Sequence, residues 1–256
     1  MGKMPGIELL KDGKRLDGRG PRDLRKIRIE AGVLEEAAGS AYVEWGGNKI
    51  IAGVYGPREC IPKHGADPYK AILKVRYVMS PFASVDEHGR SGPNRRSIEI
   101  SKVIKEAFEH VVLTNQFPRT QIDVYIEVLQ ADGGTRVASL TAAAVALADA
   151  GIPMRDIVSA VAVGKIDGTL VVDLGKNEDN FGESDVPIAI THRDKEIVLL
   201  QMDGLLTKEQ LSEDIDAAME ATEKVYQVQV PGKVTSSIAV RPPVPDDAPP
   251  FVKEVI

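Results

Sequence analysis

One stretch of fifteen residues limits the possible folds more than any other part of the sequence. Residues 137–151, VASLTAAAVALADAG, have the length of a helix and are apolar on nearly every side. A helix of this kind has no face to turn toward water, so it must be buried inside the protein. We therefore expect a fold whose core contains this helix.

The order of the other segments predicts an α+β fold. Apolar and β-branched residues predict strands over 27–34, 39–47, 49–57, 72–82 and 121–130, and hairpins over 157–174 and 186–204. Helical spacing of apolar residues predicts helices over 97–113 and 207–228. The second of these begins with Thr207 and Gln210 in capping-box spacing. Polar loops are expected over 58–71, 83–96 and 175–185. This order indicates mixed or antiparallel sheets.

The composition excludes several classes of protein. The chain has 256 residues, of which 43% are hydrophobic and 27% are charged, as in an ordinary globular protein. No window approaches the roughly 18–20 apolar residues of a membrane helix, and no signal peptide is expected. One cysteine, Cys60, cannot form an internal disulfide, nor can it build a zinc cluster with four histidines. We expect a cytoplasmic protein that does not contact a membrane.

Charge is distributed unevenly along the chain. The formal net charge is −6, but residues 1–28 carry nine Lys or Arg against four Asp or Glu. Residues 167–223 carry four Lys or Arg against fifteen Asp or Glu. The basic end could contact phosphates and the acidic end could hold a metal ion. Both could equally be solvated surface.

The anion turn, residues 131–136 with the sequence ADGGTR, joins a predicted strand to the apolar helix. Gly133 and Gly134 allow backbone N–H groups to approach a ligand closely. Thr135 offers a hydroxyl, Arg136 offers paired N–H donors, and a helix start attracts anions. These groups suit a phosphate-sized anion. The alternative is a simple strand-to-helix turn with Thr135 as the N-cap and Arg136 in solvent. Neither GxxxxGK[ST] nor GxGxxG occurs here.

An acidic segment, NEDNFGESD, provides a second candidate site. Asp179 and Asp185 are six residues apart on either side of Gly182, with Glu178 and Glu183 beside them. A loop can bring two such carboxylates together to share Mg²⁺, which uses one or two carboxylates and keeps waters for phosphate oxygens. A carboxyl with a raised pKa could also protonate a leaving oxygen. The alternative is a solvated acidic loop.

Basic residues provide two more candidates. Arg95 and Arg96 lie at a helix start, where the helix dipole disfavours cations, so an anionic ligand would explain them. Arg58, Lys63 and His64 lie on a proline-containing loop that could follow an RNA backbone. Either group could instead be ordinary surface. Arginines, an anion turn and a carboxylate pair together are the groups needed for chemistry on a phosphodiester.

Several separated motifs resemble the RNase PH family of phosphate-dependent 3′ exoribonucleases. LQADGGTR and ALADAG, followed about forty residues later by EDNFGESD, carry this resemblance. RLDGRGPRDLRKIRIEAGVL, GSAYVEWGGNKIIAGVYGPRE and RSGPNRRSIEISKVI are similar to the catalytic RNase PH-type subunits of archaeal exosomes. The resemblance implies an RNase PH-like α+β fold of two βαβ-type halves, with mixed sheets and packed helices. It indicates a flexible tail over 1–14, a catalytic domain over 15–240 and a Pro-rich tail over 241–256.

The resemblance also implies the residues of an active site. Gly134, Thr135 and Arg136 match the positions that bind the attacking inorganic phosphate. Asp179 and Asp185 match the acidic pair that holds Mg²⁺, or Mn²⁺, and assists the leaving 3′ oxygen.

Further positions match residues that contact RNA. Arg95 and Arg96 match residues that grip the backbone of the last nucleotides, and Lys63 and His64 are assigned to RNA at the neck of a pore. Polynucleotide phosphorylases have a lysine two residues after the second aspartate. This chain has Pro187 there, so no lysine is expected beside the metal.

The activity implied is 3′-to-5′ phosphorolysis of single-stranded RNA to nucleoside diphosphates, with 3′ tailing as the reverse reaction. The expected partners are the RNA 3′ end, an inactive paralogue that alternates with this chain in a six-membered ring, and RNA-binding cap subunits. The alternatives are an inert RNA-binding ring subunit, a stand-alone RNase PH that trims tRNA ends, and a metal-dependent hydrolase. The presence of Arg136, Asp179 and Asp185 together favours the active exosome subunit.

Overall fold

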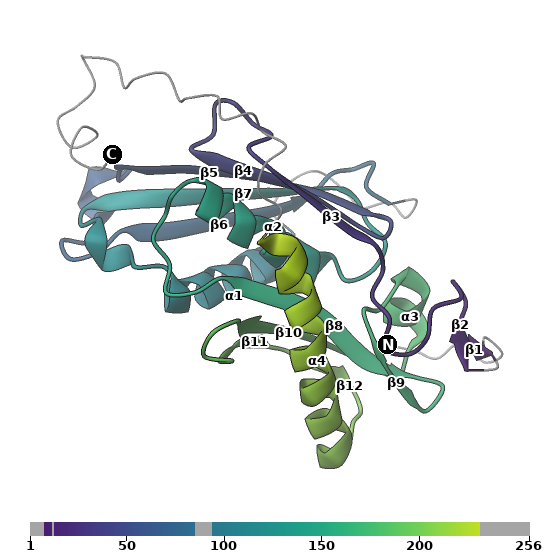
Figure 1. Ribbon diagram of the computed structural model, residues 1–256. Helices are drawn as coiled ribbons and strands as arrows, with labels where there is room; N and C mark the ends of the chain where they lie inside the picture. Colours follow the sequence, from purple (N-terminus) through teal and green to yellow (C-terminus); the bar gives the residue numbers. More distant parts are fainter. Residues whose placement is uncertain (1–7, 12, 85–93, 231–256) are drawn as a thin grey trace.

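The computed structural model describes residues 8–11, 13–84 and 94–230, which form two main β-sheets with helices packed against them (Figure 1). The strands of the first sheet lie in the order β3 (Ile27–Ala31), β4 (Gly39–Trp45), β5 (Asn48–Glu59), β7 (Thr120–Gln130) and β6 (Ile72–Met79). Strands β6 and β7 run parallel, and the other neighbours are antiparallel. The parallel pair requires a crossover, which helix α1 (Arg95–Val111) provides.

The second sheet is antiparallel. Its strands lie in the order β11 (Ile197–Leu200), β10 (Ser184–Thr191), β8 (Val158–Ile166) and β9 (Thr169–Val172), and β12 (Asp203–Gly204) also pairs with β10. Helix α4 (Lys208–Gln229) contacts β8, β9 and β10. Alternate residues of β8 therefore enter different clusters: Val161 and Val163 pack against α4, and Ala160 and Ala162 belong to the main core.

Helix α2 (Thr135–Asp149) lies between the two sheets, where it contacts β4 and β5 on one side and β8 on the other. The small side chains of Ala142, Ala143 and Ala144 are fully buried, as are Leu140 and Leu147. The prediction that this apolar helix is buried is therefore confirmed, and two sheets supply the surfaces that cover it.

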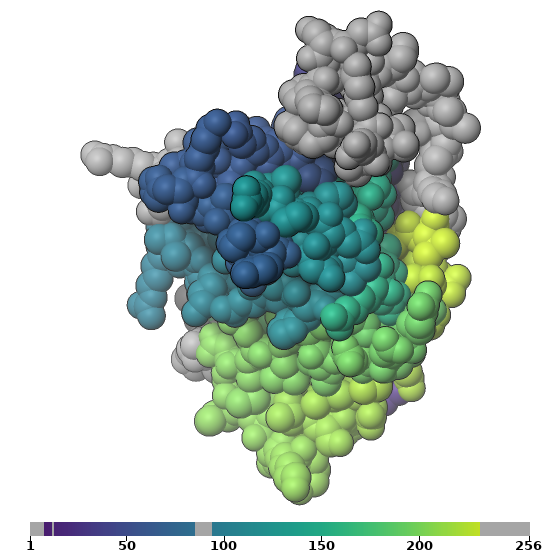
Figure 2. All heavy atoms as spheres, turned by 90° about the vertical axis from the view of Figure 1, so that its left-hand side faces the viewer, coloured from purple at the N-terminus to yellow at the C-terminus, as the bar shows by residue number. Residues whose placement is uncertain are grey.

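The two sheets correspond to two halves of the sequence. In Figure 2 the blue and teal residues of the first sheet gather above the green and yellow residues of the second sheet and α4. A functional site that combines the turn before α2 with strands of the second sheet must therefore lie where these two halves meet.

The α+β class, the mixed first sheet and the packed helices agree with the fold expected from the sequence. Thr207 and Gln210 form the predicted capping box of α4. The loop predicted over 175–185 is wrong in part, because it contains the short helix α3 (Lys176–Phe181). The Glu178 side chain accepts a hydrogen bond from the Gly175 N–H and so stabilises the start of this helix.

Part of the predicted N-terminal tail packs against the rest of the protein. Leu10–Lys11 and Lys14–Arg15 pair as the short strands β1 and β2, and Leu9 is buried in the core. The predicted C-terminal tail over 241–256 lies outside the described residues. Among the helices that the structure describes, none is long and apolar enough to cross a membrane.

Candidate active site

The anion turn leaves the end of β7 and opens helix α2. Gly133 and Gly134 have φ values of +74° and +66°, which side chains with a Cβ rarely adopt. A Cβ on Gly133 would also lie 2.5 Å from the carbonyl carbon of Gly175, so the turn packs directly on the residue that precedes α3. Gly134 is the N-cap residue of α2, and Thr135, which the alternative interpretation placed there, is the first helical residue.

The polar side chains that follow the turn are held by neighbouring elements. The Thr135 hydroxyl is buried 3.1 Å from the Tyr77 hydroxyl and 3.4 Å from an Nη of Arg96. Arg136 donates from Nη2 to Glu99 at 3.1 Å, while its buried Nε has no hydrogen-bond partner among the described residues. A buried donor without a partner is costly, so this Nε is a group that an anion would satisfy.

The carboxyl groups of Asp179 on α3 and Asp185 on β10 face the same region as the turn. Burial raises the pKa of Asp179, and the charges of Arg96 and Arg136 and a hydrogen bond from the Gly134 backbone oppose this effect. Burial and then the charge of Asp179 raise the pKa of Asp185 to about 7, against the opposing charges of Arg136 and Arg96. Each carboxyl therefore responds to the same two arginines.

The structure brings together six of the nine residues predicted from the sequence, namely Gly134, Thr135, Arg136, Arg96, Asp179 and Asp185. Arg95 is exposed at the first position of α1, next to the capping residue Asn94. Lys63 and His64 lie in an exposed 3₁₀ turn, where Lys63 pairs with Glu59 at 2.7 Å. In the part of the chain that the structure describes, no contact joins these three residues to the acidic pair.

Two models of one known protein family match most of the chain. Residues 23–153 match domain 1 of the 3′ exoribonuclease family, RNase PH, and residues 156–221 match its domain 2. The chain belongs to the RNase PH family of 3′ exoribonucleases. The two matches meet between α2 and β8, where the first half of the fold ends and the second begins.

Curated members of the RNase PH family are similar to this chain over most of its length. The Exosome complex component Rrp41 of Thermococcus gammatolerans is 58% identical over 230 residues, which cover 90% of this chain and 92% of that protein. The component of the same name from Thermoplasma volcanium is 61% identical over 218 residues, covering 85% and 88%. The resemblance to catalytic exosome subunits, and the assignment as a phosphorolytic 3′-to-5′ exoribonuclease, are therefore confirmed.

Solved structures share the RNase PH fold. The Archaeoglobus fulgidus exosome with RNA bound to the active site includes a chain that is 27% identical with a TM-score of 0.74, and the match covers 84% of this chain and 92% of that one. Rice Rrp46 has a TM-score of 0.76 at 24% identity, covering 84% and 98%. The likeness to the rice protein concerns the fold alone.

The acidic pair fits a divalent cation held jointly with a substrate. No group of three or more His, Cys, Asp or Glu side chains that could hold a metal ion occurs among the described residues. Mg²⁺, however, needs only one or two carboxylates when phosphate oxygens and waters complete its coordination. Burial and then the charge of Asp179 raise the pKa of Asp185, and a cation held by these two partly buried carboxyl groups would offset the repulsion between them.

Four residues near this site were not predicted from the sequence: Tyr77, Glu99, Asp203 and Arg25. Tyr77 touches Thr135, Glu99 pairs with Arg136, and the charge of Asp203 acts on Asp185. Arg25 contacts the anion turn. They come from β6, α1, β12 and the segment before β3. Tyr77 fits the alternating pattern of a strand, and Glu99 fits the surface of a helix. The local sequence therefore gave no sign that Tyr77 contacts Thr135 or that Glu99 pairs with Arg136.

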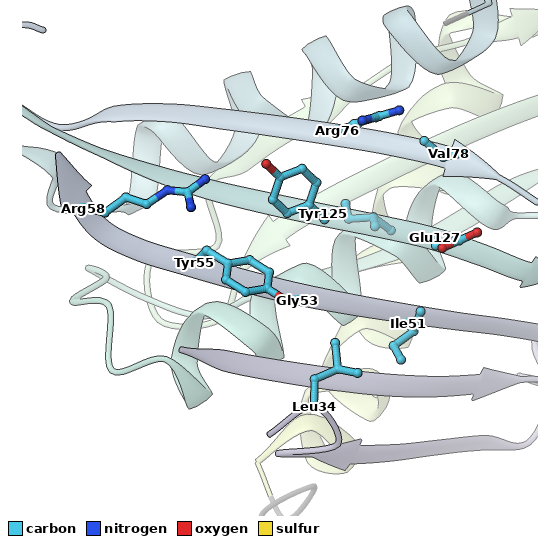
Figure 3. Close-up of a pocket in the computed structure, with 10 residues that line it drawn as sticks. Leu34, Ile51, Gly53, Tyr55, Arg58, Arg76, Val78, Tyr125 and Glu127 are labelled. Carbon is cyan, nitrogen blue, oxygen red and sulfur yellow. The ribbon is translucent and has the colours of Figure 1, made fainter. Parts of the chain in front are cut away.

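A hollow of about 660 Å³ lies elsewhere, on the outer face of the first sheet (Figure 3). Tyr55 and Tyr125 project from neighbouring strands into it, with Arg58 and Arg76 close by. Tyr77 is buried at the adjacent position of β6, and side chains alternate between the faces of a strand. The hollow is therefore on the opposite face from Thr135 and does not belong to the candidate active site.

Proposed function

We propose that this chain is the catalytic RNase PH-type subunit of an exosome ring, and that it shortens single-stranded RNA from the 3′ end by phosphorolysis. The observation that carries the proposal is the convergence of the anion turn on the acidic pair, through Arg96, Arg136 and the Gly134 backbone. The anion turn suits an attacking phosphate, and the acidic pair suits a leaving oxygen. The relatives named exosome components support the assignment to a ring subunit.

Inorganic phosphate would bind at the anion turn. The start of α2 offers backbone N–H groups, and the unpartnered Nε of Arg136 offers a charged donor. Thr135, held by Tyr77, adds a hydroxyl at a fixed position. A phosphate held in this way can attack the last phosphodiester in line, because binding has already supplied the orientation.

The acidic pair would act on the leaving side of the same bond. Attack by phosphate forms one P–O bond and breaks the bond to the 3′ oxygen, so the products are a nucleoside diphosphate and RNA shortened by one nucleotide. Without a bound cation Asp185 has a pKa of about 7, so its carboxyl could give the 3′ oxygen a proton near neutral pH; a cation on this carboxylate would lower that pKa. The reverse reaction, 3′ tailing from diphosphates, uses the same groups.

Asp179 and Asp185 would also hold Mg²⁺ or Mn²⁺. The bound cation would stabilise negative charge that develops on the phosphoryl and leaving oxygens. A proton on Asp185 and a cation between the carboxylates are alternative ways to offset the repulsion between them. Arg96 and Arg136 reduce the same repulsion from the protein side.

RNA would approach along the basic residues at the start of α1. Arg96 reaches Thr135 and acts on both aspartates, so we assign it to the phosphate group nearest the reaction. Arg95, Lys63 and His64 are assigned to nucleotides farther from the cleaved bond. Contacts to the backbone and to 2′-OH groups, without base contacts, would make the enzyme tolerant of sequence and selective for RNA.

The remaining assignments concern the assembly. We assign the chain to an alternating six-membered ring with an inactive paralogue, with RNA-binding cap subunits above it, in the cytoplasm. We also retain the division into a tail over 1–14, a catalytic domain over 15–240 and a Pro-rich tail over 241–256.

The test uses RNA labelled uniformly at its internal phosphates, Mg²⁺, and inorganic phosphate present or absent, with the chain alone and with its ring partner. The expected product is a nucleoside diphosphate that forms only with phosphate and is lost in Asp185→Asn. Nucleoside monophosphates formed without phosphate would instead identify a hydrolase. Intact RNA in every sample, with RNA still bound, would identify an inert ring subunit.

A further inference from the structure

Arg25 is buried beneath the anion turn, and only 8% of its side chain is exposed. Its Nη1 donates to the carbonyl of Asp132 at 2.5 Å, and its Nη2 lies 3.4 Å from the carbonyl of Gly133. On the opposite side, Nη2 pairs with Asp173 at 2.6 Å and Nε donates to the same carboxylate at 3.1 Å. One guanidinium therefore connects a buried acid to two successive carbonyls of the turn.

Asp173 provides a rigid anchor for this guanidinium. Its side chain is buried, it accepts a further hydrogen bond from the Arg25 backbone N–H at 2.6 Å, and Arg19 lies 3.3 Å from the same carboxylate. A buried carboxylate must be paired, so Asp173 and Arg25 fix each other's positions. Burial acts against the charge of Arg25, but the paired Asp173 and the nearby Asp132 raise its pKa overall, so it stays protonated.

The position of these carbonyls decides where the phosphate donors point. The peptide group that carries the Gly133 carbonyl also carries the Gly134 N–H, on its opposite side, and the hydrogen bond from this N–H lowers the pKa of Asp179 against the effect of burial. Thr135 and Arg136 follow directly. Asn48 restrains the same turn from the side of β5, since its amide donates to the Gly133 carbonyl at 2.7 Å. Arg25 supplies the charged restraint.

Arg25 also sets the spacing between the turn and α3. Gly133 packs against Gly175, the residue that precedes the helix carrying Asp179. The helix has a further anchor, because Arg15 forms a buried ion pair with Glu178 and also donates to the carbonyl of Asp173. With α3 fixed, a shift of the turn would change the distance from the phosphate donors to the acidic pair.

We infer that Arg25 is a positioning residue for the phosphate site. It holds the carbonyls of Asp132 and Gly133 so that the Gly134 N–H, Thr135 and Arg136 face the acidic pair. Its guanidinium is occupied by Asp173 and the two carbonyls, so it acts through the turn and does not itself contact substrate. This inference rests on the proposed function, in which the turn binds the attacking phosphate.

Arginine is required here because of its shape. A guanidinium presents donors in a planar fork, which can reach Asp173 and both carbonyls at once. A lysine ammonium keeps the charge beside Asp173 but cannot reproduce that fork. Arg25→Lys should therefore preserve folding better than Arg25→Gln, which leaves Asp173 without its main partner.

The test compares Arg25→Lys and Arg25→Gln with the control Arg28→Gln, all assembled with the ring partner. Arg28 is three residues away and exposed, and it pairs with Glu30 and Glu44. We expect the KM for inorganic phosphate to rise by about 10- to 100-fold in both Arg25 variants, since small displacements at a reacting group cost this much. RNA affinity, measured without phosphate, should change by less than about threefold. Arg28→Gln should match the parent protein.

A second readout does not need activity. Inorganic phosphate should raise the unfolding temperature of the parent protein without RNA, and this increase should shrink in Arg25→Lys. In an Arg25→Gly variant, added methylguanidinium should lower the KM for phosphate again, whereas methylammonium should not. Equal losses of RNA affinity and phosphate affinity, or a phosphate KM within twofold of the parent, would overturn the inference. If the parent protein binds phosphate but releases no diphosphate, the proposed function fails while the role of Arg25 is still tested by binding.

Discussion

The carboxyl groups of Asp179 and Asp185 come from different elements, yet the charge of Asp179 helps to raise the pKa of Asp185 to about 7. Asp179 lies on the short helix α3 and Asp185 near the start of β10, and the chain turns at Gly182 between them. A Cβ on Gly182 would lie 2.4 Å from the carbonyl oxygen of Glu178, so the reversal is tight. The pair is therefore produced by the way the chain leaves α3.

Asp185→Asn should abolish most of the phosphorolytic activity. An amide cannot exchange a proton at neutral pH and is a weaker ligand for a cation, so we expect a fall in kcat of at least about 100-fold. The release of nucleoside diphosphate from labelled RNA measures this. Asp203→Asn is the matched comparison. Asp203 lies opposite Asp185 in the pairing of β10 with β12 and its charge raises the pKa of Asp185, so its loss should change kcat by less than about fivefold. Comparable losses in both variants would argue against a direct role for Asp185.

Arg96 and Arg95 should differ although they are neighbours. Both are exposed, but Arg96 lies 3.4 Å from the Thr135 hydroxyl and its charge acts on both aspartates. Among the described residues no such contact joins Arg95 to the site. Removal of a charged hydrogen-bond donor beside the reacting phosphate costs about 1.5–3 kcal/mol, or about 10- to 100-fold in kcat/KM. We expect this loss for Arg96→Gln and less than about fivefold for Arg95→Gln, measured on a short RNA. Equal effects would show that the placement of Arg96 does not matter.

Gly133→Ala should be much more harmful than Gly151→Ala. Both residues have positive φ, of +74° and +69°, so both substitutions incur backbone strain of about 1–2 kcal/mol. A Cβ at Gly133 would also clash with the backbone of Gly175, whereas a Cβ at Gly151 meets nothing within 4 Å. Thermal unfolding should show a larger loss for Gly133→Ala, together with a raised KM for phosphate. Gly151→Ala should retain the parent KM.

Asp214→Asn should stabilise the protein at alkaline pH. Both carboxylate oxygens of Asp214 are buried in α4 without a hydrogen-bond partner among the described residues, and burial with the Glu213 charge raises the pKa of Asp214 to about 6. Because the pKa is raised on folding, the carboxyl lowers stability progressively as pH rises from about 4 through 6. The unfolding temperature of the variant should exceed that of the parent at pH 8, and the difference should shrink at pH 4. A difference independent of pH would contradict this account.

The sequence by itself determined the elements with a strong local signal. The apolar stretch of α2, the alternating strands and the capping box at Thr207 have physical causes within a few residues, so the pattern was sufficient to predict them. The same holds for the anion turn, because two glycines before a helix start can be recognised without a partner. The helix α3 was missed because it is short and its local bond from Gly175 to Glu178 depends on a distant residue, Arg15, whose buried ion pair fixes the Glu178 carboxylate.

The tertiary structure decided which of the predicted charged residues come together and which unpredicted residues hold them. Sequence placed Arg95 and Arg96 together, and packing of α1 on β6 directs Arg96 toward Thr135. Tyr77 and Arg25 are remote in sequence from the residues they hold, so no local pattern could link them to the turn. The pKa of each carboxyl depends on its burial and on the charges that lie near it. These are set only when both sheets pack against α2 and bring the groups together.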